Sequence, residues 1–266
     1  MRNIWMSLLA MLCLAASCKP DPVEPDPTGI FELSITPRVG GQEFSSDQIF
    51  ENIQGQRFNV EVFKLYLSEL RLVKEDGTEL PLTDVLLFDF VDGGVNKTEH
   101  GGGVFKQFTV PAGRYTGLKF GVGVPDSLNQ GNPALYESGH PLSVGSGMHW
   151  NWTTGYIFLK LDGRIDTTGT PTGPLDEGFT YHTGTNDLFR DMTYQADDHA
   201  FTLTKDTEVQ FSFELDLNRF FYTASDTIDM TRDNFTHTTP VGSEAFRLAE
   251  EVTDNMTQGS FYKVPF

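Results

Sequence analysis

The sequence predicts an all-β protein, an antiparallel β-sandwich with long loops and one short helix near the C-terminus. Residues 209–217 alternate strictly between apolar and polar side chains, which is the period-two pattern of a half-buried strand. Turn signals such as Glu75-Asp76-Gly77 and Pro111-Ala112-Gly113 separate further apolar runs. The chain also contains 22 phenylalanines, which is ample material for the core of one large β domain.

Taken in chain order, the other strands are expected at 30–35, 58–72, 86–90, 104–110, 115–122, 156–161 and 199–203. Within 58–72 the apolar alternation slips between Leu67 and Leu70, which predicts a bulge or a strand break. After the last strand, Ser243 is a candidate N-cap for the C-terminal helix, because Phe246 and Val252 then share one helical face.

Two stretches, 124–147 and 162–198, are expected to be loops because they are rich in Gly, Pro, Asn, Asp and Thr. Both are too long for hairpin connections, and long ordered loops in a compact domain usually carry function. The histidines that border them are His140, His149, His182 and His199. No repeat and no domain boundary is visible, so residues 30–266 are expected to form a single domain.

The first 17 residues are predicted to be a lipoprotein signal peptide. Arg2 precedes an apolar run, 4–16, that is too short to span a bilayer. Small residues then precede Cys18, so cleavage there would leave this cysteine to carry lipid. A plain secretory signal cut nearby is the alternative. The expected location is the bacterial cell envelope, lipid-anchored to the outer membrane at its periplasmic face or on the cell surface.

Residues 18–29 are expected to be a stiff, extended tether, because proline and acidic residues alternate there. Acidic residues soon after the anchor also resemble the surface-export signals of Bacteroidetes-type lipoproteins. The chain has two cysteines, Cys13 and Cys18, of which the first leaves with the leader. Any metal must therefore be held by histidine, methionine, carboxylate or a modified side chain.

The charge of the chain excludes several classes of function. A net charge of −18 and a pI near 4.6 argue against binding to nucleic acid or to anionic membrane surfaces. The sequence carries no Gly-rich phosphate loop after a strand, and no HExxH, GxSxG or CxxC pattern. We therefore expect a protein that is not an enzyme.

The segment Met148-His149-Trp150-Asn151-Trp152 is the most informative stretch of the chain. Its imidazole and thioether suit copper better than calcium or magnesium. Tryptophans that open a strand as packing material are the alternative. If the segment is extended, Met148, Trp150 and Trp152 point one way and His149 points the other. Either a tryptophan or His149 is then expected to contribute to a site.

The run MHWNWTTGYIFLKLDG, at 148–163, resembles the signature of the MbnP-like family, the methanobactin-associated periplasmic copper-binding proteins. Further stretches that resemble the family occur in the same order, at 63–72, 113–115, 120–125 followed by Asn129, 181–184 and 209–217. The resemblance covers residues 30–266. It implies copper held by histidines and by an oxidised tryptophan, kynurenine, made by a partner di-haem oxidase of the peroxidase type.

The metal candidates that follow from this resemblance are His182, His237, His149, Trp150 and Trp152. His182 is expected in a loop, where a ligand can approach closely. Two features depart from the family pattern. The first strand lacks a histidine, and the late Met-His pair reads Thr236-His237, which keeps the imidazole and loses the thioether.

Two functions remain open at this point. The first is an exported copper-binding lipoprotein that serves copper storage, delivery or sensing. The second is a metal-free β-sandwich that binds carbohydrate or a protein partner at an exposed platform of Trp150 and Trp152. For the oxidised residue, Trp150 is preferred to Trp152, because it lies nearer the flexible stretch 145–147 and should be easier for a redox partner to reach.

Overall fold

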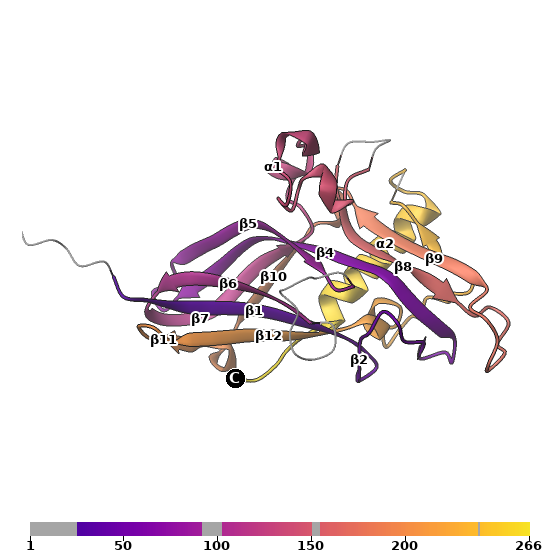
Figure 1. The fold of residues 1–266 in the computed structure, drawn as a ribbon, viewed down its shortest axis with the longest axis horizontal. Coiled ribbons are helices and arrows are strands. Elements are labelled where there is room, and N and C mark those ends of the chain that lie inside the picture. The colour runs from indigo at the N-terminus through magenta and orange to yellow at the C-terminus, as the bar shows by residue number, and fades with distance from the viewer. Residues whose placement is uncertain (1–25, 92–102, 151–154, 239) are drawn as a thin grey trace, which may run out of the picture.

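The computed structural model describes residues 26–91, 103–150, 155–238 and 240–266, and it confirms the predicted β-sandwich (Figure 1). One sheet contains β1 (Thr28–Val39), β2 (Gln42–Glu43), β6 (Val104–Pro111), β12 (Glu208–Asp216) and β14 (Phe261–Lys263). The other contains β3 (Phe50–Glu51), β4 (Arg57–Lys74), β5 (Glu79–Asp89), β7 (Gly113–Val122), β8 (Ile157–Ile165), β9 (Glu177–Gly184), β10 (Arg190–Gln195), β11 (Phe201–Leu203) and β13 (Phe235–Thr236).

Most neighbouring strands are antiparallel, as predicted, but each sheet contains one parallel pairing. β12 lies parallel to β1 over nine residue pairs, and β13 lies parallel to β9 at the far edge of the larger sheet. Parallel neighbours need long crossover connections, and these cannot be read from the alternation within a strand. The second parallel pairing positions the site described below.

β4 is the central strand of the larger sheet, and its pairing explains why its apolar pattern slips. Its first half pairs with β8 and its second half with β7, while β5 follows its other edge. The ladder is irregular between Ser68 and Arg71, where Glu69 has a φ of 50°. The bulge that the apolar pattern predicted between Leu67 and Leu70 is therefore confirmed.

The main core lies between the sheets, where aromatic side chains of both meet. Phe120 of β7 packs edge-on against Phe213 of β12, with ring centroids 5.8 Å apart. The predicted C-terminal helix is present as α2 (Glu244–Gly259), and the Ser243 hydroxyl accepts a hydrogen bond from the Phe246 amide. Leu248, Val252 and Met256 of α2 join this core.

A second apolar cluster lies on the outer face of the larger sheet. It includes Tyr66 of β4 together with Met148, Trp150, Tyr156 and Phe158. The segment 124–147 covers it with a short helix, α1 (Asp126–Asn129), and two 3-10 turns, and stands up from the sheet in Figure 1. As expected, this stretch contains no strand.

The prediction for 162–198 was wrong, because this stretch contains β9 and β10. Buried Phe179 and Tyr181 alternate with half-buried Thr180 and His182, but glycine and threonine around them hide the pattern. Smaller differences concern strand bounds and short strands. β1 begins at Thr28 within the predicted tether, and β5 begins at Glu79 rather than 86. The short strands β2, β3, β13 and β14 were not predicted. Over the described ranges, no helix combines the length and apolarity that crossing a bilayer requires.

Candidate functional site

The parallel pairing of β13 with β9 brings His182 and His237 side by side. Phe235 lies opposite Thr180 and Thr236 opposite Tyr181, so the next residues along the two strands are the two histidines. Their rings are nearly parallel, at 10°, and their centroids are 4.9 Å apart. Residues more than fifty positions apart in the sequence thus form one imidazole pair at the edge of the sheet.

His182 lies in β9, so the expectation that it sits in a loop was wrong. Its neighbours Tyr181 and Thr183 point into the sandwich, and His182 therefore points to the outer face of the sheet. Nε2 of His182 lies 2.8 Å from Oδ1 of Asp162 on β8. The other ring nitrogen, Nδ1, is buried and has no hydrogen-bond partner among the described residues.

The backbone beside His237 is strained. Thr238 is fully buried and has a φ of 67°, a left-handed conformation that β-branched residues rarely adopt. Its hydroxyl donates to the carbonyl oxygen of His182 at 3.0 Å, and the Thr236 hydroxyl donates to the carbonyl of Ala245. Such strain costs on the order of 1–3 kcal/mol and is concentrated at functional sites.

Trp150 lies on the same outer face, one pleat along β9 from His182. Its indole packs directly on Gly184, where an added Cβ would lie 2.4 Å from Cη2. Residues 182 and 184 of a strand share a face, so the indole and the imidazole pair lie on one side of the sheet. Only 2% of the Trp150 surface is exposed, so its expected accessibility to a redox partner is not what the structure shows. Trp152 falls in 151–154, outside the described residues.

His149 points away from Trp150, as the alternation predicted. Met148 and Trp150 are buried, whereas His149 is half-buried and its ring packs edge-on against Tyr156. Burial lowers the pKa of His149. The structure thus places Trp150, His182 and His237 on one face of the larger sheet and directs the His149 ring toward Tyr156.

Asn129 holds the tryptophan segment in place, a role that sequence reasoning missed. Its buried amide accepts a hydrogen bond from the Tyr156 amide at 2.8 Å and donates to Asn186 at 2.7 Å. On the other side, the ammonium of Lys160 donates to the carbonyl of Gly147 at 3.4 Å. The available signal was an asparagine in a stretch rich in Gly, Pro and Asn, because asparagine side chains often form hydrogen bonds that hold turns together.

The surroundings of His237 favour its neutral form. Burial, and then the neighbouring His182 ring, lower the pKa of His237. A neutral imidazole has one nitrogen lone pair, the form in which histidine binds metals. No group of three or more His, Cys, Asp or Glu side chains within the described ranges is placed to hold a metal ion. Imidazole nitrogen is a donor that suits copper, so the chemistry of the pair is compatible with this metal.

The remaining described histidines have structural surroundings. His140 stacks on Tyr136 at 4.3 Å, and its Nδ1 accepts the Leu142 amide. His199 packs against Tyr194 and Phe211 at the other end of the larger sheet. Both histidines are half-buried.

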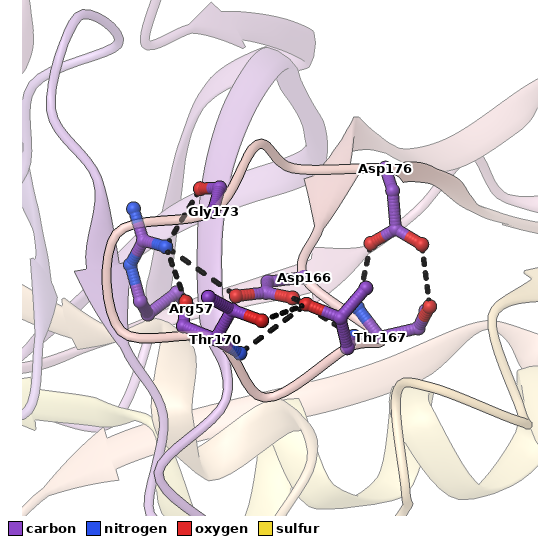
Figure 2. Close-up of polar contacts among 7 residues, drawn as sticks. Arg57, Asp166, Thr167, Thr170, Gly173 and Asp176 are labelled. Carbon is purple, nitrogen blue, oxygen red and sulfur yellow. Dashed lines mark hydrogen bonds and ion pairs between the residues drawn. The ribbon is translucent and has the colours of Figure 1, made fainter.

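A polar hollow of about 450 Å³ lies at the opposite end of the β8–β9 hairpin, and Figure 2 shows one wall of it. Nη1 of Arg57 donates to Asp166 at 3.3 Å and to the carbonyl oxygens of Thr170 and Gly173. The Thr168 amide and hydroxyl both donate to Asp166. The lining contains no histidine and no aromatic residue. It is therefore separate from the histidine pair.

Comparison with known proteins gives one family and one structure. The sequence model of the MbnP family matches residues 28–240. MbnP from Methylosinus trichosporium has a similar structure, with a TM-score of 0.49 and 21% sequence identity over 76% of this chain and 80% of that one. No curated protein matches the sequence.

Proposed function

Because the chain belongs to the MbnP family, which is linked to methanobactin and copper, we propose that it binds copper and serves copper storage, delivery or sensing. The observation that carries this proposal is the imidazole pair of His182 and His237, with a ring nitrogen buried and unpartnered among the described residues. A buried nitrogen without a partner is costly, and a bound cation would remove that cost. The role is to hold and release a metal, without catalysis.

The third donor in this proposal is an oxidised tryptophan, kynurenine, at position 150 or 152. An intact indole N–H only donates hydrogen bonds and has no lone pair for a cation. A di-haem partner of the peroxidase type, with dioxygen or peroxide as the oxidant, would cleave the indole C2–C3 bond and give the N-formyl derivative. Hydrolysis then releases the extra carbon as formate and leaves kynurenine. The resulting aryl amine and ketone can coordinate. The position of Trp150 on the face of His182 and His237 supports modification at position 150, whereas its burial opposes direct access by a partner enzyme.

The proposed location is the cell envelope, with the chain anchored to a membrane by lipid on Cys18. The small residues before this cysteine and the alternation of proline with acidic residues after it support the proposal. A copper protein outside the cytoplasm would also be accessible to an exported haem enzyme.

The alternative function, an exposed aromatic platform for carbohydrate or protein, loses support from the structure. Trp150 is buried among Tyr66, Tyr156 and Phe158, so its ring faces are covered by the protein itself. Such a platform needs exposed aromatic faces. Of the two tryptophans in that platform, Trp150, the one within the described residues, therefore offers no exposed face.

Equilibrium dialysis with Cu(I) and Cu(II), on protein purified from its native host, tests the proposal. We expect stoichiometric copper on the wild type, loss of it in His182→Ala and His237→Ala, and full retention in His199→Ala, which removes an imidazole at a distance. Peptide mass spectrometry of the same preparation should find kynurenine at position 150 or 152. Processed wild-type protein that takes up no copper would refute the metal function, and intact tryptophan at both positions would refute the modification alone.

A further inference from the structure

We infer that Asp162 is a positioning residue, which holds the hydrogen of the neutral His182 ring on Nε2 and leaves Nδ1 as the atom that binds a metal. The statement about the tautomer stands on geometry alone. The statement about the metal rests on the copper function proposed above. Asp162 was not among the residues singled out from the sequence.

The strand register places these two side chains together. In the antiparallel pairing of β8 with β9, Asp162 lies opposite Thr180 and Lys160 lies opposite His182. Asp162 and His182 are thus diagonal neighbours on the outer face, a separation that longer side chains span easily. The Oδ1–Nε2 distance of 2.8 Å is that of a good hydrogen bond, and both side chains are largely covered, with 23% and 12% exposed.

The chemistry of the carboxylate fixes the tautomer. An ionised aspartate only accepts hydrogen bonds, so Nε2 of His182 has to be the donor. In a neutral ring the lone pair is then on Nδ1. A doubly protonated ring would place an N–H in the buried Nδ1 position, where the described residues offer no acceptor.

The backbone of His182 is held as well. The hydroxyl of Thr238 donates to the His182 carbonyl, and this threonine is the strained residue that follows His237. The side chain and main chain of His182 are therefore both fixed by hydrogen bonds, and one of them links it directly to the strand of the second histidine. Partners of this kind orient a metal-binding imidazole, and removing them typically weakens metal binding about 10–100-fold.

Two variants of the full chain test the inference. Asp162→Ala removes the acceptor. Asp191→Asn is the matched control, because it removes one negative charge from an exposed position of β10 in the same sheet. The first measurement needs no metal: two-dimensional NMR on ¹⁵N-labelled protein correlates ring nitrogens with ring protons and identifies the tautomer of each histidine.

We expect His182 to carry its proton on Nε2 in the wild type and in Asp191→Asn, and to show a mixture of tautomers in Asp162→Ala. The Cu(I) affinity, measured by competition with a chromophoric chelator, should fall about 10–100-fold in Asp162→Ala only. Circular dichroism confirms that each variant is folded. A wild-type proton on Nδ1, or an unchanged tautomer in folded Asp162→Ala, overturns the inference. If the tautomers behave as expected but the wild type binds no copper, only the metal function fails.

Discussion

The two ends of the β8–β9 hairpin carry polar clusters that are built in opposite ways. At the loop end, Asp166 accepts a hydrogen bond from Arg57 (Figure 2). It also accepts hydrogen bonds from the amide and hydroxyl of Thr168. At the other end, His182 uses one ring nitrogen and leaves the second buried without a partner among the described residues. Native proteins satisfy nearly all buried polar atoms, so an exception calls for an explanation.

The two ends of the hairpin also differ in backbone strain. Thr238, beside the histidine pair, holds a left-handed conformation although it is β-branched, whereas the positive φ of the loop end belongs to Gly169. Glycine adopts this conformation without cost, and threonine does not. A satisfied and relaxed cluster stabilises a loop. An unsatisfied and strained one does not stabilise the fold, which agrees with the metal-binding role that we propose for the histidine pair.

The largest effect is expected where the indole meets the strand of the histidines. Gly184→Ala would place a Cβ 2.4 Å from the Trp150 ring and 2.5 Å from the carbonyl oxygen of Tyr156. Overpacking of this kind costs about 1–3 kcal/mol of unfolding free energy and should displace the tryptophan. Denaturant unfolding and tryptophan fluorescence measure both effects.

Gly178→Ala in the same strand is the matched control for this change, because the nearest atom to its added Cβ is 3.9 Å away. It should leave stability and fluorescence nearly unchanged. If the two variants have the same stability and fluorescence, Trp150 does not lie against β9. The conclusion that Trp150, His182 and His237 share one face would then be wrong.

A smaller effect is expected at the loop end. Arg57→Met removes a guanidinium that donates to one carboxylate and two carbonyl oxygens, and it leaves Asp166 without its cation. We expect a loss of about 1–2 kcal/mol in unfolding free energy, with copper binding unchanged. Thermal unfolding measures the loss of stability, and equilibrium dialysis measures copper binding. Copper loss in a folded Arg57→Met protein would contradict the separation of the two clusters.

The sequence allowed the fold class to be predicted because most strands carry a clear period-two pattern, as in 209–217, and because Ser243 is an ordinary helix cap. β9 escaped prediction, since Gly178, Thr180, Thr183 and Gly184 dilute its apolar residues. Position 184 requires a glycine because the Trp150 indole lies directly on it. Such a tertiary contact cannot be recognised from the sequence of one strand.

In the candidate site, His182 and His237 could be named from the family resemblance. Their contact could not be predicted, because it depends on the parallel pairing of β9 with β13, which are more than fifty residues apart in the chain. Asp162 could not be recognised as part of the site from the sequence, because its contact with His182 is set by the register of β8 with β9. Sequence patterns report which face a side chain occupies. They do not report which distant side chain shares that face.

The smallest expected effect is the pH dependence of stability that Asp166 contributes at the loop end. Hydrogen bonds from Thr168 are the main reason that the pKa of Asp166 lies below its usual 3.8. The unfolded chain therefore binds this proton first as pH falls, and the stabilising contribution is present above 3.8 and lost as pH drops through the folded pKa. Asp166→Asn, which keeps the shape and removes the charge, should lower the melting temperature by a few degrees at about pH 5. The difference from the wild type should vanish near the acid limit of folding. A difference that stays constant with pH would show that the carboxylate charge contributes nothing, and that the loop end is held by neutral hydrogen bonds alone.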